Sequence, residues 1–156
     1  QHAISIINLV RFSGRNCMTP NLEPRLISRA LPSTLTAYHD FVQEVLTTLA
    51  DYGWSKELLF GVHMALEESI TNAIRHGNKH DPTKRVHVEC ELSPNRFCAR
   101  ICDEGVGYDP QAVPDCCCPE NLESPGGRGL ALMRAYMDKV EHSNHGKCVT
   151  MEKVLD

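Results

Sequence analysis

The feature that most limits the folds open to this chain is a long apolar stripe with helical spacing between Ser55 and Gly77. Its members are Leu59, Val62, Leu66, Ile70 and Ala73. This spacing places the apolar side chains along one side of an α-helix. Ser55 suits the N-cap and Gly77 suits the C-terminus of such a helix. The stripe therefore predicts an amphipathic helix that packs against the rest of the domain.

β-Patterned runs accompany this helix and favour an antiparallel sheet. They are residues 25–31, 86–92, 97–102, 140–143 and 148–155. Short turns rich in Pro, Asn and Gly join the second run to the third and the fourth to the fifth, which predicts two hairpins. Two more helices are expected, one capped by Ser33 or Thr34 and ending at Gly53, the other following Gly129. The fold class predicted is α/β: a two-layer α/β sandwich, with a mostly antiparallel sheet and helices on one face.

The chain has the length of one domain. Its 156 residues fall within the range of roughly 100–200 residues per domain. We expect residues 25–156 to form that domain and residues 1–24 to be an N-terminal strand and linker, with a β-rich run at Ala3–Phe12. The stretch from Asp103 to Gly129 lacks periodicity, which is typical of a functional lid.

Charge and hydropathy exclude some classes of partner. The chain has 16 basic and 20 acidic residues, a net charge of −4, which argues against nucleic acid or an anionic membrane as the main partner. No apolar run approaches the roughly 18 residues that span a bilayer. Ala3–Val10 is interrupted by Ser5 and Asn8 and has no cleavage site typical of a signal peptide. We expect a cytoplasmic protein.

The eight cysteines favour structural thiols over a disulfide framework, because a chain of this length forms a core without one. Cys98 and Cys102 fall on the same side of a predicted strand, as small apolar residues would. The consecutive residues Cys116–Cys118 match no ordinary zinc site. A metal or redox role is the alternative, and its most specific form is a thiol sensor at Cys116–Cys118.

One pair of polar residues on the predicted long helix is of the type that can take part in catalysis. Glu68 and Asn72 are four positions apart and so lie on one face. A carboxylate and a carboxamide oxygen one turn apart can hold a nucleophile and Mg²⁺, an ion that takes few protein ligands together with substrate phosphates. Taken alone, the pair fits a solvated polar face of the helix better.

Two glycine-rich segments add to this pair. Asp103 ends a strand and is followed by Gly105 and Gly107, so its carboxylate can accept a hydrogen bond from an exocyclic amine while a flat ring approaches the backbone. Residues 126–129 open a helix whose backbone N–H groups and dipole favour an anion, and Arg128 adds positive charge. Singly, these are a plain Asp-Gly turn and a flexible loop. Together with the helix pair, in this order and on these elements, they are not ordinary.

The three segments together resemble the GHKL ATPase superfamily, which includes gyrase, heat-shock chaperone, histidine kinase and MutL domains. Within it, they are most similar to the small anti-sigma-factor serine/threonine kinases of bacteria. The resemblance extends over residues 25–154. It implies a Bergerat-type ATP-binding fold, ATP and Mg²⁺ as cofactors, and a homodimer.

The resemblance also implies roles for particular residues. Glu68 is expected to be the catalytic carboxylate and Asn72 the Mg²⁺ ligand. Asp103 is expected to recognise adenine, with Gly105 and Gly107 beneath the ring. Residues 108–126 would form the ATP lid. The cofactor-binding residues implied beyond the lid are Gly127, Arg128, Gly129 and Leu130.

The implied function is that of an ATP-dependent serine/threonine-protein kinase acting as an anti-sigma factor. Its implied partners are an anti-sigma-factor antagonist, which it phosphorylates, and a sigma factor. An ATP-gated protein-interaction switch with little kinase activity is the alternative and would use the same residues. The chain lacks the signatures of P-loop proteins and of ordinary protein kinases. Relatives often carry a threonine after the closing glycine, here Gly146, where this chain has Lys147-Cys148.

Overall fold

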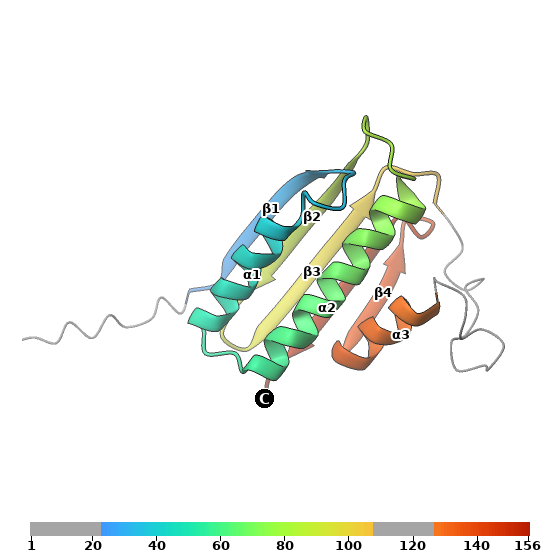
Figure 1. The fold of residues 1–156 in the computed structure, drawn as a ribbon. Coiled ribbons are helices and arrows are strands. Elements are labelled where there is room, and N and C mark those ends of the chain that lie inside the picture. The colour runs from blue at the N-terminus through green and yellow to red at the C-terminus, as the bar shows by residue number, and fades with distance from the viewer. Residues whose placement is uncertain (1–22, 108–126) are drawn as a thin grey trace, which may run out of the picture.

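The computed structural model describes residues 23–107 and 127–156, which form a five-stranded sheet with helices on one face (Figure 1). The strands are β1 (Arg25–Pro32), β2 (Arg85–Leu92), β3 (Arg96–Asp103), β4 (Lys139–Ser143) and β5 (Cys148–Val154). The helices are α1 (His39–Asp51), α2 (Lys56–Asn72), the π-helical segment η1 (Ala73–Gly77) and α3 (Gly127–Tyr136). The spatial order is β1-β2-β3-β5-β4, with every neighbouring pair antiparallel. The predicted two-layer α/β sandwich is confirmed.

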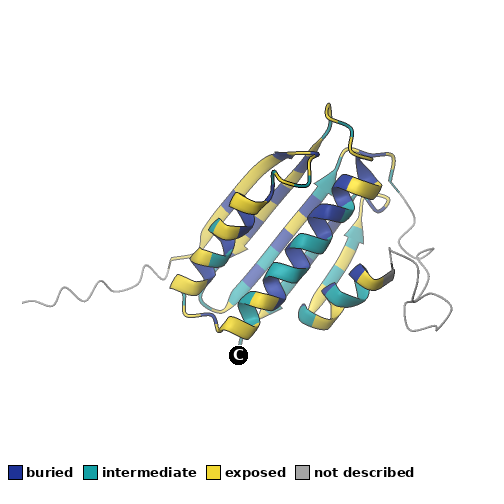
Figure 2. Ribbon diagram, in the orientation of Figure 1, coloured by how far each residue is buried: buried dark blue, intermediate teal, exposed yellow. Residues whose placement is uncertain are grey.

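The core lies between the sheet and the helices, because each layer buries one side. On β2 every second residue is buried, and the buried ones are Val86, Val88, Cys90 and Leu92. The stripe on α2 belongs to the same core: Val62, Leu66 and Ile70 have no exposed surface. Figure 2 shows this buried stripe along α2, between exposed residues at the rim of the molecule. The long helix is thus held mainly by packing of its apolar side.

The first helix begins later than predicted. It starts at His39, and neither Ser33 nor Thr34 is its cap. The Ser33 hydroxyl is buried and donates a hydrogen bond to the Lys84 carbonyl at 2.8 Å, so it serves a contact across the fold. The end of the helix is as predicted, since Gly53 has a φ of +91° with open space around it.

The long helix, formed by α2 and η1, begins and ends as predicted. The reason for a glycine at its last position, Gly77, is not the expected one. The Ser55 side chain caps α2 by accepting a hydrogen bond from the Leu58 N–H at 3.3 Å. The helix continues through η1, where the Asn78 N–H donates to the Ala73 carbonyl at 2.7 Å. Gly77 is not among the glycines with positive φ. Close packing, described below, requires a glycine there.

The other predicted boundaries differ by only a few residues. The helix expected after Gly129 begins at Gly127, and each boundary of the predicted strands lies within one residue of those of β1 to β5. The predicted N-terminal strand and the lid at 108–126 lie outside the described residues. Among the helices that the structure describes, none has the length and apolar character to cross a membrane.

The structure overturns part of the prediction for the cysteines. Cys102 on β3 and Cys148 on β5 stand directly opposite each other and form a disulfide. Antiparallel pairing brings such side chains together on one face, which the run of residues alone does not reveal. Cys98 shares the side of Cys102, as predicted, but this side faces away from the buried residues of β3, so Cys98 is only half-buried.

The remaining cysteines fall into two groups. Cys90 is a buried free thiol, as a structural cysteine would be, and burial raises its pKa. Cys17 and Cys116–Cys118 lie outside the described residues. Within residues 23–107 and 127–156, no group of three or more His, Cys, Asp or Glu side chains is placed to hold a metal ion.

Candidate functional site

The first part of the candidate site lies where the end of α2 meets the start of α3. Glu68 and Asn72 are half-buried and one turn apart on α2. The backbone of Gly129, in the first turn of α3, packs against both. A Cβ atom on Gly129 would overlap the Glu68 carboxylate and would lie 3.3 Å from Asn72 Nδ2. The structure thus brings together three predicted residues that are far apart in the sequence.

The second part surrounds Asp103 at the end of β3. A Cβ atom on Gly77 would overlap the Asp103 carboxylate, and a Cβ atom on Gly105 would overlap the Gly77 carbonyl oxygen. The Gly105 N–H donates a hydrogen bond to Asp103 Oδ1 at 2.8 Å. The turn from Asp103 to Gly105 therefore packs directly on the last residue of the long helix, and only glycines permit this approach.

The environment of Asp103 suits a hydrogen-bond acceptor for a flat polar ring. Burial raises the pKa of its carboxyl above the ordinary value, because removal from water disfavours the charged form. The hydrogen bond from Gly105 and the positive charges of Lys147 and Lys84 oppose this shift. A half-buried carboxylate with one oxygen held by the backbone is well oriented to accept a bond from an amine.

The turn between β4 and β5 lies against the same region. Gly107 has a φ of +85°, and a Cβ atom there would overlap the His145 carbonyl oxygen. The Asp103 N–H donates to the Lys147 carbonyl at 2.9 Å. A glycine is therefore required at position 107 for two reasons: the backbone there is left-handed, and the β4–β5 turn approaches closely.

The two parts of the candidate site share one helix. Asn72 ends α2 and Gly77, which touches Asp103, ends η1. The five residue steps from one to the other correspond to about 8 Å along a helix axis. Figure 1 shows the ends of α2 and β3 close together. Asn72 and Asp103 thus lie at the same end of the molecule.

The start of α3 carries the residues predicted to contact phosphate. Gly127, Arg128 and Gly129 form its first turn, where backbone N–H groups have no partner within the helix. Arg128 is exposed and Leu130 is half-buried. Gly129 is the member of this group that the structure places against Glu68 and Asn72.

The neighbouring carboxylate, Glu67, is directed elsewhere. It accepts a hydrogen bond at 3.2 Å from the hydroxyl of Tyr38, and its other oxygen lies 3.7 Å from His63 Nε2. The pKa of Tyr38 is raised by burial and by this negative charge. Of the two consecutive glutamates, Glu68 is the one packed against α3.

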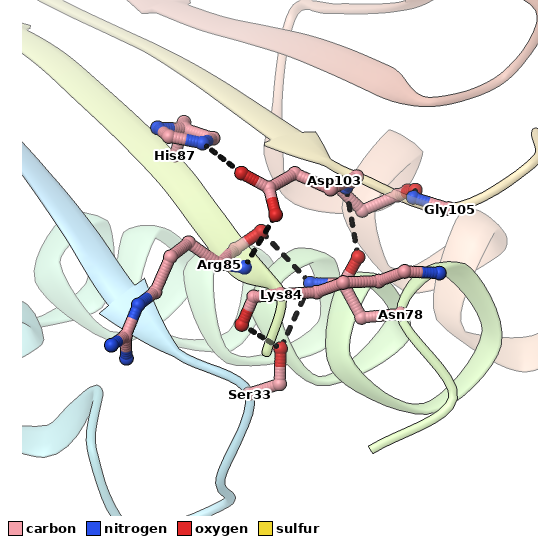
Figure 3. Close-up of polar contacts among 8 residues, drawn as sticks. Ser33, Asn78, Lys84, Arg85, His87, Asp103 and Gly105 are labelled. Atoms are coloured by element: carbon pink, nitrogen blue, oxygen red, sulfur yellow. Dashed lines mark hydrogen bonds and ion pairs between the residues drawn. The ribbon is translucent and has the colours of Figure 1, made fainter. Parts of the chain in front are cut away.

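Sequence reasoning missed Asn78, which follows Gly77. Its side chain is 1% exposed and makes three hydrogen bonds (Figure 3). Nδ2 donates to Ser33 Oγ at 2.9 Å and to the Arg85 carbonyl at 2.8 Å, and Oδ1 accepts from the Glu104 N–H at 2.8 Å. An asparagine in a polar turn is ordinarily exposed, so its place after the glycine was the only signal.

Glu104 extends this network to exposed residues of β2. Its carboxylate accepts from the Arg85 N–H at 2.9 Å and lies 2.9 Å from His87 Nε2. Both contacts lower the pKa of Glu104, the one with His87 more than the other. The residue after Asp103 is therefore tied to β2 by its side chain and to Asn78 by its backbone.

Known proteins are similar to this chain in sequence. The family described as "Histidine kinase-like ATPase domain" matches residues 29–153. The serine-protein kinase RsbW of Bacillus subtilis is 30% identical over 111 residues, which are 67% of this chain and 69% of that protein. The anti-sigma F factor of Oceanobacillus iheyensis is 32% identical over 83 residues, 51% of this chain and 56% of that protein.

A solved structure supports the fold. The crystal structure of the RsbU and RsbW domains of Rv1364c from Mycobacterium tuberculosis superposes with a TM-score of 0.58 and 18% sequence identity. The match covers 84% of this chain and 32% of that longer chain. At this identity the likeness concerns the fold alone.

Proposed function

The chain belongs to the family of histidine kinase-like ATPase domains, and we propose that it is an ATP-dependent serine/threonine-protein kinase that acts as an anti-sigma factor. Relatives about 30% identical carry the names serine-protein kinase and anti-sigma F factor. The proposed substrate is a serine or threonine hydroxyl of an anti-sigma-factor antagonist.

One structural observation carries this proposal. Glu68 and Asn72 meet the first turn of α3 at the end of the helix whose last residue touches Asp103. Three groups therefore follow one another from α2 to the turn packed on the end of η1. Glu68 supplies a carboxylate for a hydroxyl, Asn72 an oxygen ligand for a metal, and Asp103 an acceptor for an amine. This is the order of groups that a nucleoside triphosphate requires between its reacting end and its base.

The residues present fit Mg²⁺ and ATP. The carboxamide oxygen of Asn72 is of the type that Mg²⁺ takes alongside phosphate oxygens. The glycines at 77 and 105 allow the backbone to pack directly against Asp103 and hold its carboxylate in place. When bound, Mg²⁺–ATP supplies the phosphoryl group and the positive charge that balances its oxygens.

Each side chain of the site would then have a separate role. Glu68 would orient the incoming hydroxyl or accept its proton. Arg128 and the N–H groups at the start of α3 would hold the phosphate oxygens. Asp103 would accept the exocyclic amine of adenine. None of these roles requires a covalent intermediate on the protein, because phosphoryl transfer depends mainly on positioning and electrostatics.

Two substitutions separate binding from chemistry. We expect Asn72→Ala to abolish Mg²⁺-dependent ATP binding in calorimetry. We expect Glu68→Ala to bind ATP but to lose at least about 100-fold in phosphate transfer, because the carboxylate acts on the hydroxyl only. Glu67→Ala is the matched control and should retain transfer, since Glu67 is paired with Tyr38.

The outcomes decide between the candidate functions. Undiminished, metal-independent ATP binding by Asn72→Ala would contradict the nucleotide site. ATP binding by the unaltered protein without transfer to any co-encoded antagonist would favour the ATP-gated interaction switch. We also propose a homodimer that holds a sigma factor; light scattering of the protein with co-encoded candidate partners tests this.

A further inference from the structure

We propose that Asn78 is a positioning residue for adenine recognition, acting by holding the backbone on which Asp103 stands. This inference rests on the proposed function, because it assumes that Asp103 accepts the exocyclic amine of ATP. Asn78 itself lies beneath the turn and is 1% exposed, so it acts through Asp103.

The argument begins with the two peptide units on either side of Asp103. The N–H of Asp103 donates to the Lys147 carbonyl at 2.9 Å, which fixes the unit before it. The N–H of Glu104 donates to Asn78 Oδ1 at 2.8 Å, which fixes the unit after it. Because each peptide unit is planar, two anchored units leave the Cα atom of Asp103 little freedom.

The carboxylate is held from the same turn. Gly105 donates its N–H to Asp103 Oδ1 at 2.8 Å, and this N–H lies one residue beyond the peptide that Asn78 holds. If the Glu104 peptide rotates, Gly105 moves with it. Loss of the Asn78 acceptor therefore disturbs both the Cα position and the side-chain orientation of Asp103, which must be correct within a fraction of an ångström for a directed hydrogen bond.

The hydrogen bonds of Asn78 form two branches that can be tested separately. The accepted bond, from Glu104, leads to the candidate site. The donated bonds, to Ser33 and to the Arg85 carbonyl, join the end of β1 and the start of β2. Ser33→Ala removes part of the second branch and leaves the bond to Glu104, whereas Asn78→Ala removes both.

The test compares ATP with purine riboside triphosphate, which carries hydrogen in place of the exocyclic amine. We expect the unaltered protein to prefer ATP by roughly 10- to 100-fold, the range for one hydrogen bond to a charged group. In Asn78→Ala the preference should fall to about threefold or less, because ATP binds more weakly while the analogue is little affected. Ser33→Ala should be less stable but keep the full preference.

The outcomes distinguish this inference from the proposed function. No preference for ATP in the unaltered protein would contradict adenine recognition by Asp103, and with it the proposed site. A clear preference that persists in Asn78→Ala would contradict only the role of Asn78. Circular dichroism establishes that each variant is folded, and Asn78→Ser, whose hydroxyl is too short to replace the amide, serves if the alanine variant does not fold.

The unaltered protein provides a last measurement if neither variant folds. Exchange of the Glu104 amide hydrogen should be slowed more by ATP than by the analogue, since the amine draws Asp103 and its backbone into one arrangement. Equal protection by the two nucleotides would contradict the role of Asn78.

Discussion

At the scale of single residues, the glycines of the candidate site differ in what a side chain would displace. At Gly129 an added Cβ meets the carboxylate of Glu68, the far end of a flexible side chain. At Gly105 it meets the backbone carbonyl of Gly77, which cannot move without the helix. Substitution by alanine should therefore affect catalysis at the first position and the architecture of the site at the second.

We expect Gly129→Ala to fold normally and to lose roughly 100-fold in phosphate transfer, because a displacement of about 1 Å in a reacting group has effects of this size. Its affinity for ATP should change less. Gly105→Ala should lose most of its ATP binding and about 1–3 kcal/mol of stability through overpacking. Transfer assays, calorimetry and urea unfolding measure the three quantities.

Gly53→Ala is the matched control for these variants. Its Cβ meets nothing, but its φ is +91°, so alanine there should cost about 1–2 kcal/mol of stability and leave ATP binding and transfer unchanged. An equal loss of transfer in Gly53→Ala and Gly129→Ala would show that the loss reports strain in the fold and not the position of Glu68.

At the scale of elements, the sequence predicts what depends on local pattern. The course of α2 follows from its apolar stripe and from Ser55, both of which act within the helix. The start of α1 could not be predicted from the local pattern. The Ser33 hydroxyl forms hydrogen bonds with Lys84 and Asn78, which belong to other parts of the chain. Local propensity cannot reveal a side chain that a distant segment uses.

The residues of the candidate site likewise fall into those that the sequence could predict and those that it could not. The motif residues Glu68, Asn72 and Asp103 could be named from spacing and resemblance, and the structure places them at one end of the molecule. The reason for Gly77 and the role of Asn78 could not be predicted, since both depend on the approach of β3 to the end of η1. The disulfide was missed because it depends on the register of β3 and β5.

That disulfide joins β3, which ends at Asp103, to the first residue of β5, which follows the Lys147 that binds the Asp103 N–H. Its removal should be measurable. Cys102 and Cys148 are 46 residues apart, for which loop entropy gives an upper estimate of about 4 kcal/mol. We expect a dithiol reductant or Cys102→Ser to lower the free energy of unfolding in urea by up to this amount. Cys98→Ser should respond to reductant as the unaltered protein does.

Thiol labelling supplies the independent readout for this prediction. In unfolded, unreduced protein, Cys102 and Cys148 should resist alkylation, as followed by peptide mass spectrometry. Complete alkylation of both would contradict the disulfide. Equal stability with and without reductant would show that strand pairing alone holds β3 and β5 together.

At the scale of the whole molecule, the candidate site exists only in the folded chain. Its groups come from α2, β3, α3 and the β4–β5 turn, which the antiparallel sheet and the helix layer bring to one end. A ligand that requires all of them binds the native state and not the unfolded chain. Nucleotide binding and global stability are therefore linked.

The pH dependence of this linkage has a definite sign. In the free protein, burial raises the pKa of Asp103, so its ionised form weakens the fold; this penalty is absent below the unfolded pKa and complete above the raised, folded one. ATP has the opposite requirement, because its amine needs the ionised carboxylate. Stabilisation by ATP should thus be complete above the raised pKa and decline as the pH falls through it.

Thermal unfolding in the presence of Mg²⁺ and either ATP or purine riboside triphosphate tests this pH dependence. At about 100 times its dissociation constant, ATP should add about 2.7 kcal/mol of stability. Its advantage over purine riboside triphosphate at equal concentration should shrink on acidification through the raised pKa of Asp103. Protonation of the phosphates affects both nucleotides alike and cancels in the comparison. An advantage that is constant across this range would mean that the ionised carboxylate of Asp103 is not what holds the amine.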